Sequence, residues 1–474
     1  MKQFLLIISV TLLSVSCRQP KVNLVSTTPE DKWTVTENIE YGSDSKSADV
    51  VIDRTKTAQT IEGFGACFNE LGWDALSVLS SEDKHDIFNE LFTPEVGANF
   101  KVCRMPVAAN DFSLDWYSYN ETDGDFDMEN FSIENDTKTL IPYIHEAQKY
   151  NPDLKIWGSP WCPPSWMKYN NHYACAVSGD HLDEVYRNDL TEEQRGAEGT
   201  NMFIQEEDYF KAYALYFKKY IEAYREHNIN VAMVMPQNEW NSCQVFPSCT
   251  WTAAGLNEFI GKYLGPEMDK LGVELMLGTM ERPNDKMVDT IMQDEASSKY
   301  VTGVGFQWAG KEALPNVYKN YPDVKLYQTE QECGDGKNDW KHCNHSWELM
   351  KHYLSHGVNT YLYWNMALQE GGISRWGWSQ NSLVTVNKND KTYRYNYEYY
   401  LLKHVSHFVK PGAKRIITDG AFEDLLVFEN VDKSIVVIAR NMDKEAKPVT
   451  IDIDGKSLTI TLKSDSFSTI VIPS

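Results

Sequence analysis

The sequence lacks three features that would each point to a particular class of protein. It has no stripe of lysine and arginine: 68 acidic residues outnumber 45 basic ones, for a formal net charge of −23. This balance argues against charge-driven binding of nucleic acid or of an anionic membrane. It has no CxxC motif, so a structural zinc site is not expected, and after Val15 it has no apolar run long enough to span a bilayer. An uncharged substrate suits this composition, and no metal or cofactor is implied.

The chain begins with the features of a secretion signal. Lys2 precedes an apolar run from Phe4 to Val15, which Ser16 and Cys17 follow. A positive start, a short apolar segment and a small residue before a cleavage point are typical of an exported protein. A cysteine directly after the apolar segment resembles a bacterial lipoprotein signal. We therefore predict a signal peptide over residues 1–17 and a periplasmic or outer-surface lipoprotein of a bacterium, which touches the membrane only through lipid on Cys17.

Eight further cysteines form an even set. Close pairs such as Cys243/Cys249 and Cys333/Cys343 are candidates for disulfides in an exported protein. Buried free thiols are the equal alternative. Near the last of these cysteines, Asn344 is expected to cap a helix that begins near Ser346.

From Thr60 to Leu368, short β-rich segments alternate with amphipathic helical ones, a pattern typical of a parallel sheet covered by helices. Eight α/β units in this length predict a (β/α)8 TIM barrel over residues 59–404. The expected strands are Thr60–Gly65, Phe100–Pro106, Leu154–Ser159, Val231–Pro236, Val273–Thr279, Val301–Gln307, Val324–Thr329 and Thr360–Asn365. The expected helices include Ile133–Lys149, Phe210–His227, Ala253–Leu271, Asp285–Ala296 and Ser346–His356.

Short alternating runs at both ends of the chain predict an antiparallel β-sandwich side domain built from both termini, residues 32–58 and 405–474. Residues 18–31 show no core-forming pattern and are predicted to be a tether. The expected strands are Trp33–Tyr41, Asp49–Arg54, Arg415–Thr418, Leu425–Glu429, Ser434–Asn441, Lys447–Ile453, Leu458–Leu462 and Phe467–Ile472.

Two carboxylates follow the fourth and seventh strands of the expected barrel, namely Glu239 and Glu330. Barrel enzymes carry their catalytic groups at the carboxyl ends of the strands, where these two would face one another. Cleavage of a glycosidic bond needs such a pair, because one carboxyl gives a proton to the departing oxygen while the other attacks the anomeric carbon. The alternative for each is a structural ion pair on a rim loop. Glu332 competes with Glu330 as the nucleophile.

Six blocks of sequence carry a resemblance to a known family. They are Gly63-Phe64-Gly65, Arg104-Met105-Pro106 with Asp111-Phe112-Ser113, Ser159-Pro160-Trp161 with Pro164-Ser165-Trp166-Met167-Lys168, Asn238-Glu239, Thr329-Glu330 and Tyr363-Trp364-Asn365. In this order the chain resembles glycoside hydrolase family 30, which contains glucosylceramidase.

The resemblance implies roles for individual residues. Glu239, preceded by Asn238, matches the acid/base, and Glu330 matches the nucleophile. Glu70 falls where the family has an acidic residue that binds sugar hydroxyls, and Trp161 and Trp364 match tryptophans of the sugar pocket. Arg104 matches a buried arginine beside the acidic pair, where a fixed cation helps to keep a carboxylate ionised.

Departures from glucosylceramidase affect the expected substrate more than the expected chemistry. Trp240 follows the acid/base where that enzyme has proline, and Gln307-Trp308-Ala309 stands where it has His-Trp-Tyr. A ceramide aglycone is therefore not expected. The expected function is that of a retaining β-glycosidase that removes a terminal β-linked neutral sugar from a glycoside or oligosaccharide. An endo-β-1,6-glucanase of the same family and a non-catalytic surface glycan-binding lipoprotein are the alternatives.

Overall fold

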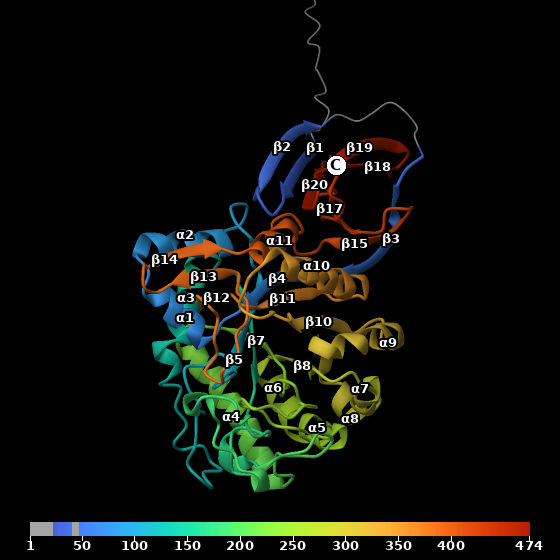
Figure 1. Ribbon diagram of the computed structural model, residues 1–474. Helices are drawn as coiled ribbons and strands as arrows, with labels where there is room; N and C mark the ends of the chain where they lie inside the picture. The colour runs from blue at the N-terminus through green and yellow to red at the C-terminus, as the bar shows by residue number, and fades with distance from the viewer. Residues whose placement is uncertain (1–21, 40–46) are drawn as a thin grey trace, which may run out of the picture.

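A computed structural model describes residues 22–39 and 47–474 of the chain. It has two parts, a barrel and a β-sandwich to which both ends of the described chain contribute (Figure 1). The predicted signal peptide and Cys17 lie outside the described residues and stay predictions. Among the described helices, none combines the length and the apolar character that crossing a bilayer needs.

Eight parallel strands close into a barrel in chain order, which confirms the predicted fold. They are β4 (Gly63–Cys67), β5 (Val102–Val107), β6 (Lys155–Pro160), β7 (Val231–Val234), β8 (Glu274–Met280), β9 (Val301–Gln307), β10 (Lys325–Glu330) and β11 (Thr360–Asn365). The first strand begins three residues later than predicted, because Thr60 belongs to a strand of the sandwich and pairs there with Lys414. Side chains such as Trp157, Met233 and Leu362 fill the barrel interior, so a ligand must bind at the loops beyond the strand ends.

Helices cover the outside of the barrel (Figure 1). They are α1 (Glu70–Ser77), α2 (Ser81–Phe92), α3 (Leu140–Tyr150), α4 (Glu207–Glu226), α5 (Ala253–Phe259), α6 (Gly265–Leu271), α7 (Asp285–Met292), α8 (Glu295–Ser298), α9 (Leu314–Asn320), α10 (Trp340–Ser355) and α11 (Tyr397–Ser406). A π-helical turn over Ile260–Leu264 joins α5 to α6. A small sheet of β12 (Ala367–Gln369), β13 (Val384–Asn387) and β14 (Thr392–Tyr395) follows β11.

Two predicted helix starts are wrong. Helix α10 begins six residues before Ser346, and its cap is Asp339, whose carboxylate accepts a hydrogen bond from the backbone N–H of His342 at 2.8 Å. Asn344 therefore lies inside the helix. Helix α3 begins seven residues after Ile133, because residues 133–139 form a turn whose side chains bind elsewhere.

Nine strands form the sandwich, in the order β19-β18-β3-β15-β16-β17-β20-β1-β2. Their bounds are β1 (Val22–Thr27), β2 (Thr34–Ile39), β3 (Val50–Thr60), β15 (Lys414–Asp419), β16 (Leu425–Glu429), β17 (Ile435–Asn441), β18 (Lys447–Ile453), β19 (Lys456–Leu462) and β20 (Ser466–Ile472). Residues 18–31 were predicted to be a tether. This prediction is wrong for Val22–Thr27, which form β1 and pair with β20. The pairing is antiparallel except between β18 and β3, which run parallel.

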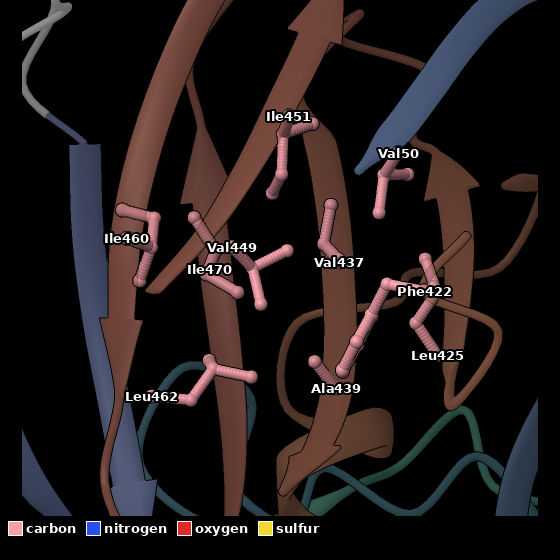
Figure 2. Close-up of a pocket in the computed structure, with 10 residues that line it drawn as sticks. All are labelled: Val50, Phe422, Leu425, Val437, Ala439, Val449, Ile451, Ile460, Leu462 and Ile470. Carbon is pink, nitrogen blue, oxygen red and sulfur yellow. The ribbon is translucent and has the colours of Figure 1, made fainter. Parts of the chain in front are cut away.

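The sheet folds over on itself, so that β18 and β19 face β16, β17 and β20 across a dry core. Figure 2 shows side chains of β16, β17 and β20 and of β18 and β19 around one small void. The void measures about 10 Å³, and the residues that line it are all apolar: Val50, Phe422, Leu425, Val437, Ala439, Val449, Ile451, Ile460, Leu462 and Ile470. A space of this size without polar partners holds neither a water molecule nor a ligand.

Candidate active site

Glu330 is the last residue of β10, and three donors hold its buried carboxylate. Oε2 accepts hydrogen bonds from Arg104 Nη1 at 2.9 Å and from Gln307 Nε2 at 3.2 Å, and Oε1 accepts one from Trp308 Nε1 at 2.9 Å. Burial raises the pKa of Glu330, while the Arg104 guanidinium and the hydrogen bonds oppose that rise. Arg104 itself is 0% exposed, so this ion pair is almost free of solvent screening.

Three tryptophans enclose Arg104. Its Cζ lies 4.3 Å from the ring centroid of Trp161, 5.1 Å from that of Trp157 and 5.6 Å from that of Trp364. The rings of Trp161 and Trp364 stack with centroids 5.2 Å apart. The structure thus brings both predicted pocket tryptophans to the site, where they hold the cation. Their contact with a sugar stays a prediction.

Glu239 lies in the loop after β7 and is held by neutral amides. Its Oε1 accepts a hydrogen bond from Gln307 Nε2 at 3.2 Å, and its Oε2 accepts one from Gln244 Nε2 at 2.8 Å. Burial and the charge of Glu330 raise the pKa of Glu239 well above its usual range. The preceding Asn238 accepts a hydrogen bond from Arg104 Nη2 at 2.6 Å, which ties the loop that carries Glu239 to the cation.

Gln307, at the end of β9, bridges the two carboxylates. Its Oε1 accepts a hydrogen bond from Thr329 Oγ1 at 2.9 Å, and this contact turns its Nε2 toward Glu239 and Glu330. Both carboxylate oxygens lie 3.2 Å from that one nitrogen, so they are no more than twice this distance apart. In the sequence, Gln307 and Trp308 stand out only because they differ from the residues of glucosylceramidase. Their position at the end of a strand is the signal that could have indicated a role.

Two other predicted acidic residues lie apart from this pair. The carboxylate of Glu332 binds Lys311 Nζ at 2.7 Å and His345 Nε2 at 3.0 Å. Burial alone would raise its pKa, but these two contacts outweigh burial and lower the pKa to about 2. Glu332 is thus a structural ion pair and does not compete with Glu330.

Glu70 is also placed differently from the expectation. It opens α1, and its carboxylate accepts hydrogen bonds from Leu114 N at 3.0 Å, Asn135 Nδ2 at 2.8 Å and Thr139 Oγ1 at 3.0 Å. These donors belong to the segment after β5, so Glu70 fixes that segment, and both of its oxygens are engaged there. The predicted binding role is corrected to a structural one.

Asp111, in the loop after β5, is an acidic residue for which the sequence predicted no role. It is 4% exposed, and its Oδ1 and the nearby Nε1 of Trp364 have no hydrogen-bond partner in the described part of the chain. Burial and the charge of Glu330 raise the pKa of Asp111 well above its usual range. Buried polar atoms without hydrogen-bond partners need an explanation, and at the strand ends of a barrel a bound ligand is one. Asp111 therefore replaces Glu70 as the candidate for binding sugar hydroxyls.

The eight cysteines from Cys67 to Cys343 are all free thiols in the structure. Neither predicted disulfide is formed: Cys343 is buried within α10, whereas the Sγ of Cys333 donates to the carbonyl of Gln331. Over residues 22–39 and 47–474 there is no cluster of three His, Cys, Asp or Glu side chains that could hold a metal ion.

Residues 61–409 match the pattern of the glycosyl hydrolase family 30 TIM-barrel domain, and residues 412–470 match that of the family 30 beta sandwich domain. The chain belongs to glycoside hydrolase family 30.

Lysosomal acid glucosylceramidase of Mus musculus is 25% identical to it over 84% of this chain and 78% of the relative. Endo-1,6-β-D-glucanase neg1 of Aspergillus fumigatus is 26% identical over 90% of this chain and 88% of the relative. The solved structure of SrfJ from Salmonella typhimurium superimposes with a TM-score of 0.83, at 23% identity, over 96% of this chain and 100% of that one. The protein is therefore a glycoside hydrolase with this family's two-domain fold.

Proposed function

We propose that this family 30 enzyme is a retaining β-glycosidase in which Glu239 is the acid/base and Glu330 the nucleophile. The observation that carries the proposal is the Gln307 bridge, which limits the separation of the nearest carboxylate oxygens to twice 3.2 Å. Retaining glycosidases hold their carboxyl groups about 5–5.5 Å apart, whereas inverting ones leave about 6.5–9.5 Å for a water molecule. The bridge supports the shorter spacing.

The surroundings of the two carboxylates support the assignment of roles. Glu330 has the guanidinium of Arg104 in direct contact and three donors in all, so its ionised form is favoured. Glu239 has only neutral donors, two amides and the Ser242 hydroxyl, and the charge of Glu330 nearby, so its protonated form is favoured. A pair whose environments separate the two pKa values in this way suits an acid and a nucleophile.

The two-step reaction follows from these states. Protonated Glu239 gives its proton to the departing oxygen while Glu330 attacks the anomeric carbon and forms a glycosyl-enzyme. Glu239, now ionised, then takes a proton from the water that releases the sugar. Asn238 has its Oδ1 occupied by Arg104 and Thr279, which leaves its Nδ2 for a sugar hydroxyl.

We propose a β-linked glucosyl unit as the substrate, removed from the end of a glycoside. Both curated relatives described above are named for β-glucosyl substrates, one a glucosylceramidase and one an endo-1,6-β-D-glucanase. A second candidate is internal cleavage of a β-1,6-glucan. The half-buried rings of Phe246 and Trp378 favour it, because they lie 5.3 Å apart beside the acid/base loop, where a further sugar ring could stack.

The products of two substrates test the proposal. An aryl β-glucoside and a β-1,6-glucan are incubated with the enzyme and with Glu330→Gln, and the first-formed anomer is followed by NMR. The β anomer is expected first, with glucose as the sole early product of the glucan. The α anomer first would overturn retention, and early release of oligosaccharides would favour the endo alternative.

A further inference from the structure

Lys168, in the loop after β6, is a buried cation whose recorded contacts include no carboxylate. It is 2% exposed, and its Nζ donates hydrogen bonds to the carbonyls of Tyr173 at 3.1 Å, Ala174 at 3.3 Å and Ser248 at 2.7 Å. A charge buried in this way is costly unless an opposite charge lies close to it. Besides these carbonyls, the groups that lie close to Lys168 are the thiols of three cysteines.

The sulfurs of Cys162, Cys175 and Cys249 lie beside Lys168. Burial raises the pKa of Cys162 to about 12 and that of Cys249 well above its usual value, so both stay neutral. Cys175 differs, because the neighbouring Cys243 thiol and then the charge of Lys168 lower its pKa. Its Sγ donates a hydrogen bond to the carbonyl of Ser248 at 3.3 Å. Cys175 is thus the thiol of this cluster that loses its proton most readily.

The backbone brings Cys175 and Cys243 together. The N–H groups of Cys175 and Ala176 donate to the carbonyl of Gln244 at 3.0 and 2.8 Å, so the two cysteines lie on adjoining segments. The N–H of Ser248 donates to the carbonyl of Tyr173 at 2.9 Å and continues this pairing. Cys175 is buried and Cys243 is half-buried. A reagent from solution therefore reaches Cys243 first, with Cys175 directly behind it.

We propose that Cys175 and Cys243 are a dithiol–disulfide site that links the loop after β6 to the acid/base loop, residues 240–250. A small disulfide such as oxidised glutathione exchanges with Cys243, which forms a mixed disulfide and releases one thiol. The Cys175 thiolate then attacks Cys243 Sγ, and the second thiol leaves. The two cysteines lose two electrons and two protons, and the small disulfide takes them up as two thiols.

The linked loop bears on catalysis because it carries Gln244. The Nε2 of Gln244 donates to Oε2 of Glu239 at 2.8 Å, one residue away from Cys243. A disulfide would fix this loop in the folded enzyme and would also close a long loop in the unfolded chain, which raises stability. The thermal midpoint of the oxidised enzyme should therefore exceed that of the reduced enzyme by several degrees.

Thiol counting and peptide mapping test the site. The native enzyme is treated with oxidised glutathione, and its thiols are then counted after denaturation. We expect the loss of two thiols, one peptide linked through Cys175 and Cys243, and reversal of both changes and of the higher thermal midpoint by dithiothreitol. Cys249→Ala is the matched control from the same cluster and should keep the linked peptide.

Several outcomes would overturn the proposal. They are an unchanged thiol count, a linkage through Cys249, or a mixed disulfide on Cys243 that persists in the wild type. Cys243→Ser replaces a half-buried side chain and should fold, and it should abolish both the linkage and the rise in thermal midpoint. If Cys175→Ser does not fold, Cys243→Ser still decides the matter, because a remaining rise would contradict the pairing.

Discussion

The mouth of the barrel and the core of the sandwich are both closed to solvent, yet they bury opposite kinds of side chain. At the mouth, Arg104, Glu239 and Glu330 are 0%, 4% and 3% exposed and are joined by hydrogen bonds. In the sandwich, apolar side chains surround a void of about 10 Å³. Burying charge is costly, whereas burying apolar surface stabilises the fold.

Left-handed residues occur in both regions, but at different kinds of position. In the sandwich, Lys433 and Asp454 have φ of 69° and 53° and are exposed. At the mouth, Glu239 and Trp308 have φ of 48° and 47° and belong to the carboxylate pair and its donors, and such a conformation costs on the order of 1 kcal/mol each. Backbone strain and buried charge both destabilise the folded state at the mouth. They indicate that this region is arranged for chemistry and that packing elsewhere in the molecule offsets the destabilisation. Substitutions at the mouth should therefore act mainly on turnover, and substitutions in the sandwich mainly on stability.

The largest effect is expected for Glu330→Gln. Loss of the proposed nucleophile should lower kcat for an aryl β-glucoside by about 10⁴- to 10⁶-fold, the range found when one residue of a catalytic triad is removed. The control is Glu332→Gln, because that carboxylate is held by Lys311 and His345 outside the pair. A comparable loss in both variants, measured by release of the aryl group, would contradict the assignment.

Glu239→Ala tests the other half of the mouth. Substrates with poor leaving groups should lose about 10²–10⁴-fold in rate, whereas a dinitrophenyl glycoside should lose far less in its first step, because its leaving group needs no proton. The pKa of Glu239 is raised, so wild-type kcat/KM should fall as pH rises through that pKa. The variant should lack this alkaline limb. A uniform loss across leaving groups would count against the acid role.

The sequence predicted the barrel and the glutamate pair because both depend on local signals. Each barrel strand is a short apolar run; Glu239 lies in the loop after one of them, and Glu330 ends another. Strand β1 carries a weaker signal, since Val22–Thr27 is short and its partner β20 lies at the other end of the chain. Pairing over that distance is not visible in a local pattern.

Side-chain partners were harder to predict than positions. Glu70 has the residue type of a sugar ligand, but its three donors come from a segment that only the fold brings near. Gln307 can bridge two carboxylates only because β9 and β10 are neighbours and Thr329 fixes the orientation of its amide. The sequence therefore predicted where the candidate site lies. The contacts that favour an ionised Glu330 and a protonated Glu239 are visible only in the folded chain.

Ile470→Ala addresses the sandwich side of the comparison. Ile470 is 1% exposed and lines the void, so removing its side chain enlarges an existing cavity. We expect a loss of about 2–5 kcal/mol in the free energy of unfolding, measured with urea, and an unchanged kcat at 25 °C. Val471→Ala, on the other face of β20, should cost less than half as much. A fall in kcat of the folded Ile470→Ala enzyme would break the proposed division between the two regions.

His404 joins the two regions, and its substitution is expected to have the smallest effect. Its ring nitrogens bind Thr27 and Thr469 of the sandwich at 2.9 and 2.8 Å from its place in α11. Burial, with a smaller contribution from Lys403, lowers its pKa to about 3. The unfolded chain has the ordinary value of about 6.5, so the stabilisation by neutral His404 is full above that pH and is lost as pH falls toward 3. Between pH 7 and pH 4, protonation of His404 should lower the free energy of unfolding of the wild type by on the order of 3 kcal/mol. A His404→Gln variant should lack this decrease.

Urea unfolding of both proteins at pH 7 and pH 4 measures this difference, with His85→Gln on the exposed face of α2 as the control. Equal losses of stability in the wild type and in His404→Gln would contradict this prediction. They would show that protonation of His404 does not weaken the contact between the barrel and the sandwich.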